Sequence, residues 1–418
     1  MLVLMYRAVH ADRGGRILVT EFPALAFDGA RYAPFADALP LPPDAVVVPL
    51  EREALASERS GKPRRLGAGR LAAAALLPPG YLRAQLPAYV DATDRPDIAP
   101  RAYAAVAADE NGALVVSGLQ LDRDATHDAS SYLRAEVAAK VADGLRAHPG
   151  DKLIRQLARC AREYGCHAAA NAFFGRWECG LPIAAPSNEK APAAIAPKRD
   201  GEAEPTEVAA FHPSTDEIVR LGLAHLAAGG TILSFGRECE GEPLLAAREV
   251  EDATTRIRAV TREGTIHLNT NGSVPGGLRR LVGAGLDSIA VRILAASPAA
   301  YEALHVPDGY RFADVRASIR LAADLPIATS VLVLVLPGLF DRPSELAALI
   351  ALVGDLPEGS ALLLRDLHAD PLRALALVPD RANAPLGVAR AVERIREELP
   401  SLRVGAFVRP LARVPHVP

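Results

Sequence analysis

A short acidic turn, CEGEP at residues 239–243, follows an apolar run that reads TILSFG. Its glycine lets backbone carbonyls approach a ligand closely, and the Glu242 carboxylate can accept a charge-assisted hydrogen bond from an ammonium group. A plain turn with a solvated carboxylate has the same composition, so both interpretations stay open. The candidate ligand-binding residues of this turn are Cys239, Glu240, Gly241, Glu242 and Pro243.

Polar residues also follow or interrupt later apolar runs. The segment NTNG at 269–272 either contacts a ligand or forms a tight turn, because Asn and Gly tolerate left-handed backbone conformations. Arg292 interrupts the run SIAVRIL: pointing inward it would bind a carboxylate or phosphate, and pointing outward it would pair with a helix acid. The candidate binding residues in these runs are Asn269, Thr270, Asn271, Arg292 and Arg365.

The segment LLLRDLHADP at 362–371 places several polar groups at the end of an apolar run. Such groups are costly inside a protein unless they pair with one another or with a ligand. His368 beside Asp366 and Asp370 is the one triplet suited to acid–base chemistry, and a solvated strand end is the alternative. The ten histidines show no zinc-binding spacing, and no nucleotide-binding or nucleophile-elbow motif is present.

The elements that must position these residues follow a regular pattern after Pro213. Apolar runs alternate with amphipathic helical segments, for example GTILSFG before REVEDATTRIRAV and DSIAVRIL before FADVRASIRLAA. Continuous apolar strands that alternate with helices indicate an α/β fold with a parallel sheet and right-handed crossovers. Periodicity alone does not separate a barrel from a doubly wound sheet, and in both folds ligands gather at the carboxyl ends of the strands.

Several segments, taken in order, resemble radical S-adenosylmethionine (SAM) proteins over residues 157–371. The resemblance implies a partial (β/α)6 TIM-like barrel in which CEGEP is similar to the G-G-E-P turn that receives the SAM amino group. NTNG then stands at the position of a T-N-G turn. Aliphatic residues at 290, 294 and 332 replace expected polar cofactor contacts. The segments are EYGCHAAANAFFGRWE, SFGRECEGEPLL, TIHLNTNGSVP, AGLDSIAVRIL, YEALHVPDGYRFADVRASIR, VLPGLFD and LLLRDLHADP.

One loop departs from the family pattern. In the relatives a C-x3-C-x2-C loop ligates three irons of a 4Fe-4S cluster, and the resemblance places Ser187, Ala191 and Ala194 at those positions. Iron–sulfur clusters are held by Cys thiolates. We therefore expect no metal, and at most weak binding of S-adenosylmethionine.

Four cysteines remain in the chain, at positions 160, 166, 179 and 239. Cys160 and Cys166 are six residues apart on a predicted helix, so they point to different faces. Cys239 is the one placed near the expected ligand. An unusual cluster built from these thiols is the alternative to a metal-free barrel.

The chain divides by composition into five parts. Residues 1–150 mix strand-like runs with a helix near 131–147, which predicts an α+β appendage, and 151–178 predict a connecting helix that Asp151 caps. Residues 179–212 are rich in Pro, Ala and charges, and we expect this degenerate cluster loop to lack fixed structure. Residues 213–410 predict the barrel and 411–418 a tail.

Composition and net charge limit the kinds of partner that the protein is expected to bind. The chain has 418 residues, of which half are hydrophobic, and a formal net charge of only −3, which does not favour nucleic acid or an anionic membrane. The apolar run at 327–336 is far shorter than the ~20 residues that span a bilayer, and the first residues lack the apolar core of a signal peptide. We expect a cytoplasmic protein with free thiols, and the Ala, Arg and Pro content suggests a bacterial source.

The function expected from these observations is that of a pseudoenzyme or binding scaffold. It would hold a small molecule, a peptide or a homologous protein partner at the barrel mouth. The alternatives are an active radical SAM enzyme with non-standard cluster ligands, and a metal-free barrel enzyme that uses Arg365, Asp366 and His368.

Overall fold

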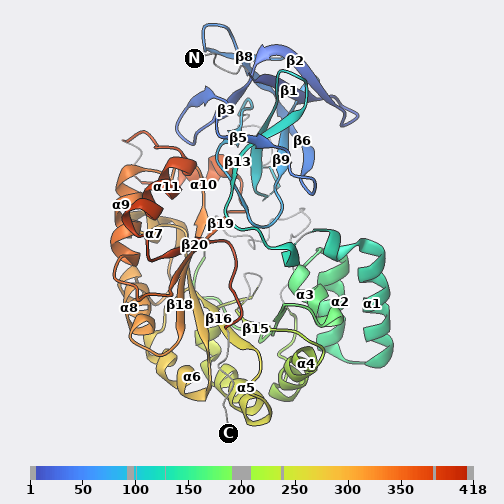
Figure 1. The fold of residues 1–418 in the computed structure, drawn as a ribbon, viewed down its shortest axis with the longest axis vertical. Helices are drawn as coiled ribbons and strands as arrows, with labels where there is room; N and C mark the ends of the chain where they lie inside the picture. Colours follow the sequence, from blue (N-terminus) through green and yellow to red (C-terminus); the bar gives the residue numbers. More distant parts are fainter. Residues whose placement is uncertain are drawn as a thin grey trace.

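The computed structural model of the protein describes residues 6–91, 98–99, 101–127, 129–190, 209–236, 240–379 and 383–411. Within these ranges the chain forms an N-terminal β domain, a small helical unit and a large α/β domain (Figure 1). No helix in the described ranges combines the length and apolar character needed to cross a membrane.

The N-terminal domain is built from antiparallel strands. Its main sheet has the order β10-β13-β12-β1-β9-β6, with β2 added at β1 and β5 at β13. The central strand β12 is buried along its whole length, because Ala104, Val106 and Ala108 pack into one apolar cluster and Ala105 and Ala107 into another. The strands are β1 (Arg7–Ala11), β2 (Ile17–Pro23), β3 (Leu25–Phe27), β4 (Tyr32–Pro34), β5 (Ala38–Pro40), β6 (Val46–Glu53), β7 (Leu55–Ser57), β8 (Pro63–Arg65), β9 (Leu71–Leu76), β10 (Tyr81–Arg83), β11 (Leu86–Pro87), β12 (Tyr103–Ala108) and β13 (Leu114–Gln120).

The helical unit follows as α1 (Arg134–Ala147), α2 (Lys152–Glu163) and α3 (His167–Phe174). Asp151 caps α2 as predicted, accepting hydrogen bonds from the amides of Leu153 and Ile154 at 2.9 and 3.1 Å. The single helix expected across 151–178 is wrong. The chain breaks at Gly165, whose φ of 62° lies in the left-handed region that favours glycine, and a second helix starts after it.

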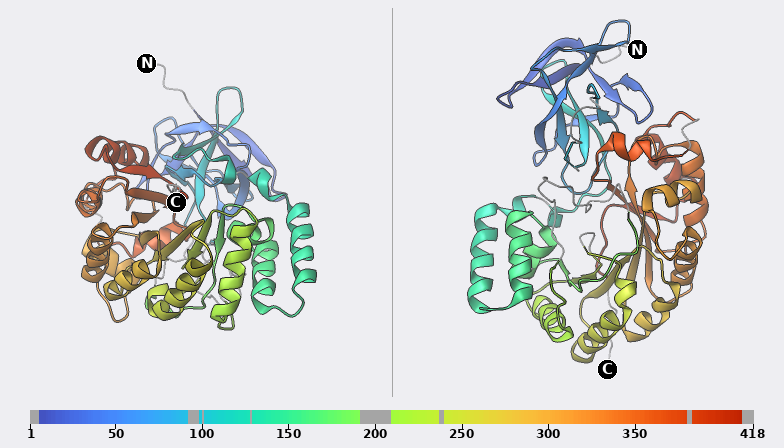
Figure 2. Two further views of the ribbon diagram at one scale, coloured as in Figure 1. Left: turned by 60° about the horizontal axis from the view of Figure 1, so that its bottom comes forward. Right: turned by 180° about the vertical axis from the view of Figure 1, so that it is seen from behind.

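The α/β domain contains seven parallel strands in sequential order, from β14 to β20. Consecutive order places each crossover on the same side, so the helices cover the outer face of the curved sheet (Figures 1 and 2). This order excludes the doubly wound alternative, in which the strand order reverses at a switch point. The strands are β14 (Glu178–Gly180), β15 (Ile232–Phe235), β16 (Thr265–Thr270), β17 (Ser288–Ile293), β18 (Ala328–Val335), β19 (Ala361–Asp366) and β20 (Arg403–Gly405).

Over the described residues the parallel sheet has seven strands where the resemblance implied six, and it starts before residue 213. The edge strands β14 and β20 have three residues each, which is too short to leave an apolar pattern in the sequence. The helices between the strands are α4 (Thr215–Ala227), α5 (Ala247–Val260), α6 (Leu278–Ala284), α7 (Pro298–His305), α8 (Phe312–Ala323), α9 (Pro343–Val353), α10 (Pro371–Ala376) and α11 (Val388–Glu398).

The two faces of the parallel sheet differ in composition. The outer face packs aliphatic side chains such as Leu268, Val291 and Val333 against the helices in the largest apolar cluster. The inner face carries His267 on β16 and Arg292 on β17, next to a small cluster of four buried apolar residues: Ala290, Leu332, Ala361 and Leu363. Aliphatic residues therefore do fill the inner positions at 290 and 332.

The N-terminal domain packs on the carboxyl ends of β17–β19 (Figure 1). Leu86 and Phe27 join an apolar cluster with residues that follow those strands, including Leu294 and Leu367. Asp122 accepts a hydrogen bond from the amide of Ala406 at 2.7 Å. The N-terminal β domain therefore covers the carboxyl ends of these strands, which form the mouth of the sheet.

Candidate functional site

The segment after β14 lies across the carboxyl ends of the next strands and meets the turn at 240–243. The amide of Ile183 donates to Glu240 Oε2 at 3.0 Å, and the amide of Glu242 donates to the Pro186 carbonyl at 2.8 Å. A Cβ on Gly241 would lie 2.1 Å from the Ala185 carbonyl oxygen. Glycine is needed in this turn because the chain's own carbonyls approach it.

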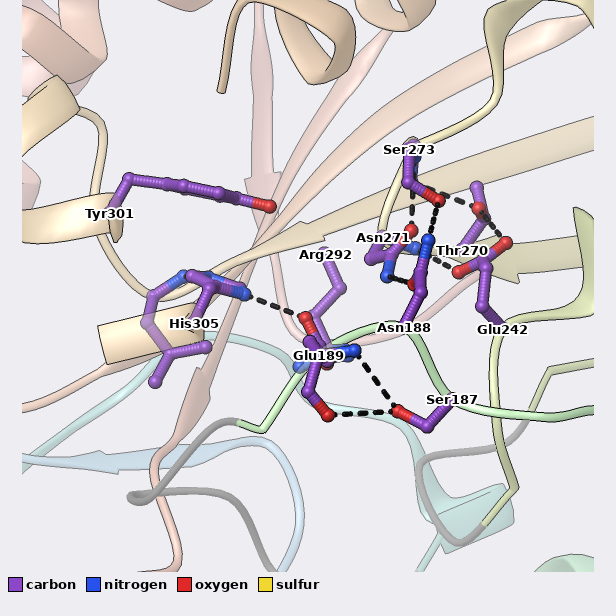
Figure 3. A network of polar contacts seen from close by, with 12 residues as sticks. Ser187, Asn188, Glu189, Glu242, Thr270, Asn271, Ser273, Arg292, Tyr301 and His305 are labelled. Carbon is purple, nitrogen blue, oxygen red and sulfur yellow. Dashed lines mark hydrogen bonds and ion pairs between the residues drawn. The ribbon is translucent and has the colours of Figure 1, made fainter. Parts of the chain in front are cut away.

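Residues 181–190 therefore have a defined conformation, which corrects the expectation that all of 179–212 lacks one. Asn188 donates to Ser273 Oγ at 2.9 Å and accepts from Asn271 Nδ2 at 2.9 Å (Figure 3). Its carbonyl accepts from the Asp308 amide at 2.8 Å, and the Lys190 amide donates to the Val306 carbonyl at 3.2 Å. These hydrogen bonds connect the segment to the turn after β16 and to the connection between α7 and α8.

Glu242 is 4% exposed, and its carboxylate is engaged by three donors of its own chain. Oε1 accepts from the Leu244 amide at 2.9 Å and from the Thr270 hydroxyl, while Oε2 accepts from the Asn271 amide at 2.6 Å. Burial raises the pKa of Glu242 to about 7 against the opposing effect of these hydrogen bonds. The carboxylate fastens the start of the short helix Pro243–Ala246 to the end of β16.

The residues after β16 form the tight turn that was one of the two interpretations of NTNG. Gly272 has a φ of +71°, and the Thr270 hydroxyl accepts from its amide at 2.9 Å. Asn269, on β16, donates to the Phe235 carbonyl at 3.3 Å. Thr270 and Asn271 thus donate hydrogen bonds to Glu242, and the Asn271 side chain also donates one to Asn188.

Arg292 points into the mouth of the sheet, which resolves the choice between its two orientations. It forms an ion pair with Glu189, a residue of the segment after β14 (Figure 3). The other carboxylate oxygen of Glu189 accepts from His305 Nδ1 at 2.9 Å and from the Tyr310 hydroxyl at 3.3 Å. Burial alone would raise the pKa of Glu189, but Arg292 and His305 together hold it well below its ordinary value.

His305 is completely buried, and each of its ring nitrogens has a hydrogen-bond partner. The Leu294 amide donates to Nε2 at 3.0 Å, so Nε2 must carry a lone pair and the proton lies on Nδ1, facing Glu189. Burial also lowers the pKa of His305. This histidine is a neutral hydrogen-bond donor whose one ring lone pair, on Nε2, already accepts from the Leu294 amide, so no lone pair is free for general-base chemistry.

The polar groups after β19 contact different parts of the structure. Asp366 faces Arg83 of the N-terminal domain, and Asp370 caps α10 through the amides of Leu372 and Arg373. Arg365 donates to the Ala406 carbonyl at 3.0 Å, and His368 is exposed. The two acids that flank His368 in the sequence hold separate parts of the fold.

The donors in the described part of the chain do not fit a 4Fe-4S cluster. Ser187 Oγ donates to the Glu189 carbonyl at 3.0 Å, whereas Ala191, Ala194 and Cys239 lie outside the described residues. Cys160 is in α2 and Cys166 caps α3, while Cys179 is buried in β14. Within the described ranges, no group of three or more His, Cys, Asp or Glu side chains is arranged to hold a metal ion.

Sequence reasoning missed the residues that join Arg292 in its largely buried polar contact, namely Glu189, His305 and Tyr310. Two signals were present. A glutamate stands inside a loop that has no other function once the cysteines are gone, and His305 lies in an apolar helix end. Neither signal identifies the partner, because the contact joins residues 103 and 116 positions apart.

Comparisons with known proteins return matches among solved structures alone, since no family model and no curated protein matches the chain. The FeFe-hydrogenase maturase HydG from Carboxydothermus hydrogenoformans is 13% identical and covers 67% of this chain and 72% of its own, with a TM-score of 0.37. A radical SAM methyltransferase from Sphaerobacter thermophilus is 17% identical, with coverages of 55% and 64% and a TM-score of 0.35. Streptococcus suis SuiB, bound to precursor peptide SuiA, is 8% identical, with coverages of 72% and 69% and a TM-score of 0.38.

The Sphaerobacter thermophilus protein is a radical SAM methyltransferase, and the sequence segments resemble that superfamily. All three TM-scores are below 0.5, so the α/β fold rests on the strand order and crossovers described above and not on these likenesses. Identities of this size carry no information on activity, substrate or partner.

Proposed function

We propose that this protein is a radical-SAM-like partial barrel that works by binding, without a 4Fe-4S cluster and without radical catalysis. The observation that carries the proposal is the position of Glu189. It belongs to the segment that would hold the cluster in the relatives, and it is buried in an ion pair with Arg292 at the carboxyl ends of the strands. A protein carboxylate anchors this segment where thiolate–iron bonds would otherwise do so.

The donor set supports the same proposal. A serine oxygen and two alanine methyl groups replace the three thiolates, and a cluster needs Cys ligands. The Glu242 turn, which would receive the amino group of SAM, has its carboxylate engaged by three internal donors. We expect the affinity for SAM to be weak, since the contacts that remain are those of the backbone.

The partner of such a protein would be a small molecule, a peptide or a homologous enzyme, in a cytoplasmic setting. The charge balance of 47 basic and 50 acidic residues gives no reason to expect nucleic acid or a membrane surface. The apolar contact of the β domain with the carboxyl ends of β17–β19 is consistent with a scaffold, because it holds the two domains together.

An assay of SAM consumption tests this proposal. The protein is incubated without air with iron, sulfide, a strong reductant and SAM, and the remaining SAM is measured by chromatography. The expected result is no consumption beyond that in a protein-free control. Consumption that scales with protein concentration would show that an unusual ligand set supports catalysis.

A further inference from the structure

Three hydrogen-bond donors from separate elements converge on the carboxylate of Glu189. Arg292 comes from β17 and His305 from the end of α7 (Figure 3). Tyr310 comes from the connection before α8. Together they supply one positive charge and two neutral donors to the two oxygens of one carboxylate. This is the donor pattern that recognises carboxylates, with an arginine fork and preset neutral donors.

Two of the three donors, His305 and Tyr310, have further contacts that do not involve Glu189. The Leu294 amide fixes the tautomer of His305, so that Nδ1 carries the proton whether or not a carboxylate is present. The His305 ring stacks on Tyr301 with centroids 3.9 Å apart, and Tyr301 stacks in turn on Phe312 at 4.4 Å. The Tyr310 hydroxyl lies 3.2 Å from that of Tyr301. The acceptor-binding groups are therefore part of the barrel wall.

Glu189 itself belongs to a segment at the protein surface. Its neighbours Ser187 and Lys190 are exposed, while its own side chain is only 9% exposed. Two non-glycine residues at this contact have left-handed backbone conformations, Ala184 with a φ of 51° and Val306 with a φ of 45°. Such conformations are unfavourable for alanine and more so for β-branched valine. Backbone strain at Ala184 and Val306 offsets part of the cost of breaking the Asn188 and Lys190 hydrogen bonds, which the segment must give up to leave the site.

We propose that Arg292, His305 and Tyr310 form a binding site for a small organic carboxylate, and that Glu189 is its built-in occupant. A ligand carboxylate competes with Glu189, and its binding releases residues 187–190 from the mouth of the sheet. The enclosed position of the Glu189 side chain favours a short acid of similar length, such as propionate. This inference rests on the proposed function as a binding protein and names the ligand class of the same site.

Chemical rescue of the Glu189→Ala variant tests the proposal. Its melting temperature is compared in sodium propionate and sodium chloride of equal ionic strength. In chloride we expect a fall of about 5 °C relative to the wild type, because a buried guanidinium loses its anion. Propionate should restore more than half of that loss with a saturating dose dependence, and should raise the melting temperature of the wild type by much less, because there it must first displace Glu189.

Two variants serve as controls. Asn188→Ala loosens the same segment through its bonds to Ser273 and Asn271, but leaves the three donors occupied by Glu189, so propionate should not restore its stability. The double variant Glu189→Ala/Arg292→Met should also be insensitive to propionate. Equal melting temperatures of Glu189→Ala in both salts, or equal rescue of Asn188→Ala, would overturn the proposal.

If Glu189→Ala does not fold in chloride, its purification in propionate becomes the test. Folded protein that is lost on dialysis into chloride supports the carboxylate site, and a chain that is unfolded in both salts contradicts it. Neither result depends on iron or SAM. Failure here therefore leaves the SAM-consumption result, and with it the metal-free barrel, to be judged separately.

Discussion

Arg83 and Asp366 form an ion pair across the boundary between the N-terminal domain and the parallel sheet, with Arg83 Nε 3.6 Å from Asp366 Oδ1. The Arg83 side chain is fully buried, and it donates through a second nitrogen to the Leu367 carbonyl at 2.8 Å. Among the described residues, its Nε and Nη1 have no hydrogen-bond partner. Burial lowers the pKa of Arg83 and raises that of Asp366 to about 7.

A double-mutant cycle measures what this pair contributes to stability. Arg83→Met should lower the free energy of unfolding by about 2–3 kcal/mol, because it leaves a buried carboxyl group without its partner. Asp366→Asn should cost less, because the folded protein already favours the uncharged side chain at this position. The double variant should lose about 2 kcal/mol less than the sum of the two. Urea unfolding at neutral pH gives all four values, and additive losses would show that the two side chains do not interact.

The same carboxylate predicts a pH dependence of stability. The pKa of Asp366 is about 7 in the folded protein and near 3.8, the ordinary value for an aspartate, in the unfolded chain. The folded state then binds the proton more tightly, so the contribution is complete below about pH 4 and is lost as the pH rises towards about 7.

The measurement is urea unfolding of the wild type and Asp366→Asn between about pH 5 and about pH 8. The wild type should lose stability relative to the variant as the pH rises, by at most about 4 kcal/mol over the full range. The difference between the two proteins isolates Asp366 from Glu242 and Asp341, whose pKa values burial raises to about 7 and about 6. A constant difference across this range would contradict the prediction.

The close approach of two glycines joins the same two domains. A Cβ on Gly338 would lie 2.4 Å from the Gly29 Cα, and the φ of Gly338 is +85°. Gly359 has nearly the same φ, +87°, and its Cβ would meet nothing within 4 Å, so it provides a matched control.

Gly359→Ala should cost about 1 kcal/mol of unfolding free energy, through backbone conformation alone. Gly338→Ala should cost at least about 2 kcal/mol more, because the domains must also move apart. Chemical denaturation gives the difference, and limited proteolysis should cut Gly338→Ala faster between the domains. Equal losses in the two variants would mean that the contact is not tight.

Glu242 gives a prediction about the turn at the end of β16. Glu242→Gln puts an amide nitrogen where an oxygen now accepts hydrogen bonds from buried donors, and should cost about 2–3 kcal/mol. Glu249→Gln is the control, because Glu249 is exposed on α5, and it should change stability by less than about 0.5 kcal/mol. Thermal or urea unfolding of both variants tests this. A loss no larger than that of the control would restore the interpretation of a solvated turn.

The sheet was predictable from the sequence because its central strands are long apolar runs, and each of them precedes an amphipathic helix. The edge strands β14 and β20 were not predictable, because three residues are too few to show a hydrophobic periodicity. The break between α2 and α3 depends on the left-handed conformation of Gly165. A single glycine within an otherwise helical pattern does not by itself predict a helix break.

The candidate site was predictable in part for a related reason. Arg292 stands out because a charge inside an apolar strand needs a partner, and Glu242 stands out by its motif. Their partners are set by tertiary packing: the inner face of β17 meets a segment more than a hundred residues earlier in the chain. Burial of Glu242 and Asp366 likewise comes from neighbours that the local sequence does not contain.

The central claim is that this barrel holds no iron–sulfur cluster. The most direct measurement is the iron and sulfide content of the protein purified without air and passed through gel filtration. The account predicts a colourless protein with far less than one iron per chain. About four irons and four sulfides per chain, co-eluting with a brown protein, would contradict it.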